Sequence, residues 1–276
     1  MRFARWWALG LVVALVVACN STPKATETPA PDPQVLLDTA AAVVRNAKSV
    51  RIKLQLTGAP SYVDPPVTPG GPGNYIAFVS ADGLYLAPDR VQAKIVARLF
   101  GVPGEVEVIA VGDDQWMRNA VLTGNLWVKR QFAPGFNAAK LVSSDQGIES
   151  ALKAFRDLKM IGIEDVDGTP MYHVKGHAAG SDVAALTVGL IRGVDVLIDA
   201  YVVVETGLVD RVVLVQPETV TDQEPKPTTW TLEIFDYNAA DIQINPPEVP
   251  PATAAATVPA TAPATLPATA EAGQAP

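Results

Sequence analysis

Few residues in this chain could catalyse a reaction or hold a metal ion. The only two histidines, His173 and His177, lie four residues apart in a segment that alternates like a strand, so we expect both on one solvent-facing side. Zinc requires three or four ligands, and only distant carboxylates such as Asp165 or Asp167 could complete such a set. The sequence therefore predicts no metal site.

The motifs of common enzyme classes do not occur in the sequence either. It contains no G-x-S-x-G, no glycine-rich phosphate loop that opens a helix, and no H-E-x-x-H. Carboxylate pairs exist at Asp113-Asp114 and Glu164-Asp165, but the first pair lies at an expected turn, where solvated acids are common. We expect a protein that is not an enzyme, with no catalytic residues and no cofactor.

The remaining reactive side chain is Cys19, the only cysteine of the chain. Arg2 and Arg5 precede an apolar run that ends at this cysteine, which is the layout of a secretory signal. The run is shorter than the ~20 apolar residues that cross a bilayer, so we expect it to direct export and not to span. A lone thiol in an exported protein otherwise invites unwanted pairing.

The residues that precede the cysteine, Val16-Val17-Ala18, resemble the lipobox of bacterial lipoproteins. The resemblance implies that a signal peptide over 1–18 is removed and that Cys19 becomes a diacylglyceryl cysteine with acyl chains such as palmitate. Two acyl chains suffice for stable membrane attachment. The expected location is the extracytoplasmic face of the cell membrane. The alternative is that Cys19 is an incidental residue of an ordinary signal.

Charge limits the partners of the mature chain. Removal of two arginines with the signal changes the formal net charge at pH 7 from -8 to -10. Such an acidic chain is repelled by nucleic acid, so nucleic-acid binding is excluded.

Composition divides the mature chain into three parts. Residues 19–33 are rich in proline, threonine and alanine and predict a flexible tether. Residues 246–276 contain consecutive Pro-Ala-Thr units with almost no charge, and we expect them to be disordered. A wall-threading or glycosylated stalk is the alternative for this tail. Residues 34–245 have the length of one domain.

Periodicity predicts the elements of that domain. Helical spacing indicates a helix over 34–47, and strict alternation indicates strands over 49–58, 90–100, 105–112 and 228–238. Turn residues predict hairpins about Asp82-Gly83, Asp167-Gly168 and Thr206-Gly207. Shorter helices are expected over 145–158 and 181–191. The predicted fold is α+β: a large curved antiparallel sheet, a half-barrel, with two or three helices that cover its concave face around an apolar cavity.

The apolar positions of the predicted strands are candidates for the cavity wall. Ala93 and Ala97 are small where a closed core would need bulk, which indicates open space. Trp116 and Trp127 belong to one expected hairpin, where they either fill the core or line the pocket or its mouth. The predicted lining is Val50, Ile52, Leu54, Leu56, Val91, Ala93, Ile95, Ala97, Val106, Val108, Trp116, Trp127, Leu232 and Ile234.

Several stretches, in their order along the chain, resemble one protein family. The lipobox is followed by "AKSVRIKLQLTG", "DGLYLAPDRVQA", "VGDDQWM", "TGNLWVK", "GIEDVDGTPMYHVKG" and "LVDRVVL". This order is similar to the LppX/LprAFG family of lipid-binding lipoproteins, which have a LolA-like half-barrel. The resemblance implies a hydrophobic cavity that holds acylated lipids or glycolipids, and it brings no catalytic residues.

The sequence thus predicts a membrane-anchored extracytoplasmic lipoprotein that binds acylated lipids and carries or transfers them across the cell envelope. A membrane lipid exporter is a candidate partner. Two alternatives remain: an envelope-stress sensor or regulator with the same fold, and a structural lipoprotein without ligand.

Overall fold

The computed structural model of the protein describes residues 30–63, 76–99, 101–131, 137–143, 145, 147–187, 189–191 and 193–249. All of them except Ala30 belong to the unit Pro31–Pro276, one of two into which the chain divides. The predicted signal peptide, Cys19, the tether up to residue 29 and the tail from residue 250 lie outside these ranges. Within them, no helix has the length and the apolar character needed to cross a bilayer.

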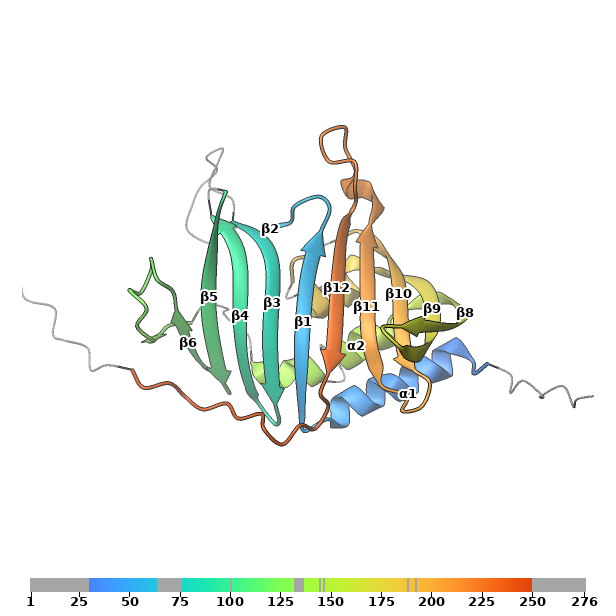
Figure 1. The fold of residues 1–276 in the computed structure, drawn as a ribbon, viewed down its shortest axis with the longest axis horizontal. Coiled ribbons are helices and arrows are strands. Elements are labelled where there is room, and N and C mark those ends of the chain that lie inside the picture. Colours follow the sequence, from blue (N-terminus) through green and yellow to red (C-terminus); the bar gives the residue numbers. More distant parts are fainter. Residues whose placement is uncertain are drawn as a thin grey trace, which may run out of the picture. The chain divides into compact units, whose positions relative to one another are not determined.

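One antiparallel sheet dominates the fold (Figure 1). Its strand order is β7-β6-β5-β4-β3-β1-β12-β11-β10-β9-β8, and the short β2 pairs with β3. The first long strand therefore pairs with the last one at the centre of the sheet. The strands are β1 (Ser49–Thr57), β2 (Tyr62–Val63), β3 (Ile76–Leu86), β4 (Arg90–Leu99), β5 (Val102–Val111), β6 (Asp114–Arg118), β7 (Val128–Lys129), β8 (Arg156–Val166), β9 (Thr169–Ala179), β10 (Asp195–Val203), β11 (Val209–Gln216) and β12 (Thr228–Phe235).

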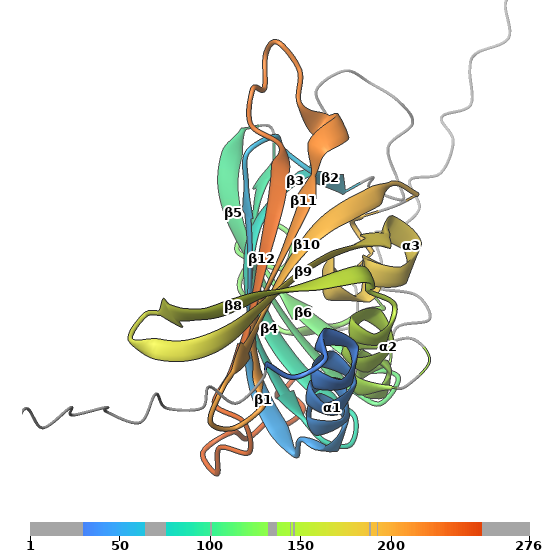
Figure 2. The same ribbon diagram turned by 90° about the vertical axis from the view of Figure 1, so that its right-hand side faces the viewer.

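The helices cover one face of this sheet (Figure 2). The longest, α1, begins after Asp32, whose side chain accepts hydrogen bonds from the backbone N–H groups of Gln34 and Val35. The helical elements are α1 (Pro33–Asn46), α2 (Ile148–Lys153), α3 (Gly180–Val183) and the short 3₁₀ helices η1 (Ala138–Val142), η2 (Ala184–Thr187) and η3 (Pro217–Thr219). Together with the large antiparallel sheet, they confirm the α+β half-barrel expected from the sequence.

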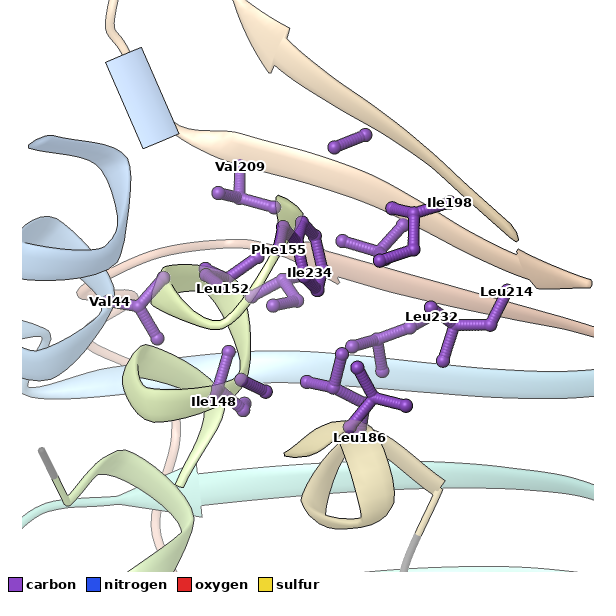
Figure 3. Packing of buried hydrophobic residues seen from close by; sticks show 14 of the residues in the cluster. Val44, Ile148, Leu152, Phe155, Leu186, Ile198, Val209, Leu214, Leu232 and Ile234 are labelled. Atoms are coloured by element: carbon purple, nitrogen blue, oxygen red, sulfur yellow. The ribbon is translucent and has the colours of Figure 1, made fainter. Parts of the chain in front are cut away.

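The main hydrophobic core lies between the helices and the covered face of the sheet. In Figure 3, Ile148 of α2 and Leu186 of η2 lie on the helical side, with Leu232 and Ile234 of β12 on the sheet side. Trp230 of β12 is completely buried. Buried residues alternate along β10 and β12, and along β11 apart from one irregularity after Val209, because one face of these strands packs on the core.

Two predicted elements differ from the structure. The hairpin about Asp82-Gly83 is wrong, because β3 continues through these residues and the chain turns at residues 87–89. Asp82 is paired on both sides, with Lys53 of β1 and Lys94 of β4, and such pairing overrides the turn preference of Asp-Gly. The helix expected over 145–158 is also shorter, since β8 already begins at Arg156.

The segment that follows β12 packs against the start of the sheet. Residues 236–249 run past the ends of β1, β3 and β4 (Figure 1). Ile242 and Ile244 are buried there. The Arg90 guanidinium donates a hydrogen bond of 2.7 Å to the backbone oxygen of Ile244, and the Ser49 hydroxyl donates one of 3.1 Å to that of Ala239. This segment is therefore part of the domain.

Candidate ligand cavity

An apolar cavity of about 140 Å³ lies between the concave face of the sheet and the helices. The strands β1, β3, β4, β5 and β12 form its floor, and η1, α2 and η2 contribute the rest of its wall. The lining residues are Ile52, Leu54, Ala81, Gly83, Leu84, Tyr85, Val91, Ala93, Ile95, Val108, Ala110, Leu141, Ile148, Ala185, Leu186 and Leu232.

Small residues in register create this space. Gly83 pairs with Ile52 on one side and with Ala93 on the other, and Ala93 pairs with Val108. Residues paired directly across antiparallel strands share a face, so this row carries little side-chain volume at its middle. The backbone of Gly83 does not have a positive φ, so no turn requires a glycine there. We infer that the glycine at position 83 serves to leave room in the cavity and is not required by the backbone conformation.

The only polar side-chain atom on the lining residues is the hydroxyl of Tyr85. It donates a hydrogen bond of 3.0 Å to the backbone oxygen of Pro88. Burial, and to a smaller degree the charge of Asp89, raise the pKa of Tyr85 above its ordinary value. The phenol therefore stays neutral, and the cavity offers a ligand apolar contact only.

A buried ionic contact holds α2 over the cavity. The Glu149 side chain, next to the lining residue Ile148, is completely buried. Its Oε1 lies 3.0 Å from Arg45 of α1 and 2.7 Å from Lys153. In the described part of the protein, Glu149 Oε2 has no hydrogen-bond partner. Breaking such a buried pair is costly, so the contact fixes α2 against α1.

Half of the predicted lining residues lie on the cavity wall. Ile52, Leu54, Val91, Ala93, Ile95, Val108 and Leu232 line it. Val50 and Ile234 are buried in the adjoining core, and Leu56 packs against that core. Ala97 and Val106 lie on β4 and β5 outside the lining. The prediction missed Ala81, Gly83, Tyr85 and Ala110; alternation along an unbroken β3 would have indicated the first three.

Trp116 and Trp127, expected either to fill the core or to line the pocket or its mouth, lie outside the lining of this cavity. Trp116 pairs with Ile109, which alternates with the lining residue Val108 and so faces the opposite side of the sheet. There the two tryptophans pack in a second cluster with Ile109 and the buried Ile244. No local pattern in the sequence indicates that residues after β12 cover this surface.

The histidines share one face of β9 but differ in environment. His173 is buried, which corrects the expectation of a solvent-facing side chain. Its Nδ1 lies 2.6 Å from Glu164 of β8 and its Nε2 lies 2.6 Å from Asp199 of β10. Both ring nitrogens are thus occupied, and the ring joins three strands. His177 lies 3.1 Å from Asp157, which is exposed.

The described ranges contain no candidate metal site. No group of three or more His, Cys, Asp and Glu side chains is placed there to hold a metal ion. The cavity itself contains no titratable group other than Tyr85. What the site can do chemically is to exclude water from an apolar ligand.

Comparison with known proteins agrees with this geometry. The sequence matches the family described as LppX_LprAFG lipoprotein over residues 32–244. The crystal structure of LprF from Mycobacterium bovis has a TM-score of 0.57 at 15% identity, covering 80% of this chain and 99% of that chain. The lipoprotein LppX from Mycobacterium tuberculosis has a TM-score of 0.50 at 19% identity, covering 78% and 100%. No curated protein sequence matches significantly. The chain belongs to the LppX_LprAFG lipoprotein family.

Proposed function

We propose that the protein binds acylated lipids or glycolipids in the cavity and carries or transfers them across the cell envelope. The observation that carries this proposal is a cavity of about 140 Å³ with wholly apolar contacts in a lipoprotein family fold. A membrane lipid exporter is the class of partner that would supply the ligand. Neither catalysis nor a cofactor is part of the proposal.

The energetics require such a pocket. Moving a 16-carbon chain from a bilayer into water costs on the order of 12 kcal/mol, at about 0.8 kcal/mol per CH₂. A carrier must return most of this free energy, so its site must be dry and apolar. An engineered cavity of about 150 Å³ holds one benzene. A full acyl chain therefore requires the cavity to widen when the chain binds.

A charge in the cavity tests the proposal. Ala93→Asp places a carboxylate among lining residues, whereas Lys94→Asp places one on the opposite, solvated face of β4. We expect Ala93→Asp to abolish lipid loading with the fold retained, because a roomy site can hydrate when its ligand is lost. Native mass spectrometry gives the lipid content, and thermal unfolding gives the stability. Unfolding of Ala93→Asp, together with a wild type that never contains lipid, would leave a structural lipoprotein.

The membrane anchor is the second part of the proposal. Cys19 lies outside the described residues, and its role rests on the lipobox resemblance. We expect Cys19→Ser to prevent acylation and to leave the chain soluble or uncleaved. The measurement is membrane partition together with the mass of the mature N-terminus. Unchanged partition with an intact mature N-terminus would contradict the anchor.

A further inference from the structure

The loop between β6 and β7 exposes three aliphatic side chains. Val121 is 85% exposed, Leu122 is 65% exposed and Leu126 is 55% exposed. Figure 1 shows this loop beyond the β6 edge of the sheet, away from the helices. We call Val121, Leu122 and Leu126 the aliphatic tip. Single exposed aliphatics are common, but three within six residues form a patch that requires a reason.

The loop holds this tip in a defined shape. The Oδ1 of Asn119 accepts hydrogen bonds of 2.9 Å from the N–H of Val121 and 2.8 Å from that of Leu122. The Asn119 amide donates a bond of 2.7 Å to the backbone oxygen of Glu105 in β5. The hydroxyl of Thr123 accepts a bond of 3.0 Å from the Asn119 N–H. The exposure of the tip is therefore built into the turn.

The residues at the base of the loop have the chemistry of a membrane–water interface. Residues 119–127 contain no acidic side chain, although the whole chain is acidic. Trp127 is half-buried at the end of the loop, and the Arg118 guanidinium lies 4.9 Å from its ring centre. Arg130 is exposed, and so is Lys129, whose Nζ lies 2.8 Å from the exposed carboxylate of Asp114. Amphipathic rings and basic side chains favour the headgroup level, and aliphatic side chains favour the acyl chains beneath it.

We propose that the aliphatic tip inserts into a lipid bilayer, with Trp127 and Arg130 at the level of anionic headgroups. This inference goes beyond lipid carriage and does not depend on it. A protein partner is the less suitable occupant, since a stable interface buries ~800 Å² on each side and three side chains on a narrow loop provide much less. A bilayer surface requires no such area and no shape complementarity.

Fluorescence at the tip tests the proposal in the full chain. An environment-sensitive dye is attached to the thiol of the Leu122→Cys variant after Cys19 has been acylated. A wild-type chain treated in the same way shows how much dye reacts with Cys19. The matched control is Val220→Cys, an exposed aliphatic position in the loop between β11 and β12. The chains are reconstituted in vesicles of phosphatidylcholine with about a third phosphatidylglycerol.

We expect the dye at position 122 to gain several-fold in emission and to be quenched by spin-labelled acyl chains. The dye at position 220 should do neither. Leu126→Asp in the labelled Leu122→Cys chain should abolish the gain while the melting temperature and the lipid content stay unchanged. Equal responses at 122 and 220 would overturn the proposal. A response that requires native membrane proteins and is absent in pure lipid vesicles would also overturn it, in favour of a protein partner.

Discussion

Gly83 of β3 and Ala93 of β4 lie directly opposite each other on the floor of the cavity. A Cβ atom placed on Gly83 would lie 3.9 Å from the Cβ of Ala93, which is an ordinary contact distance. The volume of the cavity thus depends on two of the smallest side chains, placed where the sheet is paired on both sides. Because the backbone at position 83 would accept a side chain, the effect of these two small residues is to keep this part of the cavity open.

Filling this space should remove the ligand without harming the fold. We expect Gly83→Val to lower the lipid content at least several-fold and to leave the melting temperature unchanged or higher, because a β-branched residue suits a central strand and fills a void. Native mass spectrometry and thermal unfolding provide the two readouts. Gln92→Val, on the opposite face of β4, is the control. Full lipid content in Gly83→Val would show that the ligand binds elsewhere.

The two histidines should differ in their effect on stability. His173→Gln should lower the free energy of unfolding by about 1.5–3 kcal/mol, since the side chain is buried and contacts two carboxylates. His177→Gln should change it by less than about 0.5 kcal/mol, because its contact with Asp157 is largely solvated. Urea unfolding of both variants is the measurement. Equal losses would show that the ring of His173 does not join the three strands.

Asp210 should make stability depend on pH. It is the extra residue of a bulge in β11, and burial is the main cause that raises the pKa of Asp210 above its ordinary value. The folded state then binds this proton more tightly than the unfolded state does, so stability falls as pH rises through the folded-state pKa. Asp210→Asn removes this cost.

We therefore expect Asp210→Asn to raise the melting temperature at pH 7, with a gain that shrinks on acidification and disappears below about pH 4. The control is Asp222→Asn at an exposed position in the loop before β12. A gain that does not depend on pH would assign the effect to something other than the titration of Asp210.

Truncations of the segment after β12 should lower the stability of the domain only when they remove its buried residues. Truncation after Ala239 removes the buried Ile242 and Ile244, each of which contributes about 1.5–3 kcal/mol. We expect a fall of several degrees in melting temperature for this truncation. Truncation after Val249, which removes only the predicted disordered tail, should leave the melting temperature unchanged. A fall with the second truncation would indicate that the tail packs on the domain.

Local alternation was sufficient for much of the fold. The period of a strand is local, so alternation alone predicts that Val50, Ile52, Leu54 and Leu56 share one face of β1. All four pack in or against the core, and Ile52 and Leu54 also line the cavity. The hairpins at Asp167-Gly168 and Thr206-Gly207 are confirmed, with positive φ at Asp167, Gly168 and Gly207. In both hairpins, the two strands that flank the turn are consecutive in the sequence and pair directly with each other.

Register and remote packing could not be read in the same way. Whether Trp116 faces the cavity depends on its pairing with Ile109, and a shift of one residue would reverse its face. The wall residues Ile148 and Leu186 come from short helices whose position over the sheet is set by tertiary contacts. Elements of four to six residues are too short for their periodicity to indicate which side chains face the cavity.

The pairing of β1 with β12 has a kinetic consequence. These strands lie near opposite ends of the domain sequence, yet Leu56 pairs with Trp230 at the centre of the sheet. Joining them closes a loop that contains almost the whole domain, and such non-local contacts make folding slow. The cavity needs Leu54 from β1 and Leu232 from β12, so it does not exist until the last strand has emerged and joined the first. Until then, the inner edges of β1 and β11 lack partners, and the growing chain is most open to aggregation at that stage.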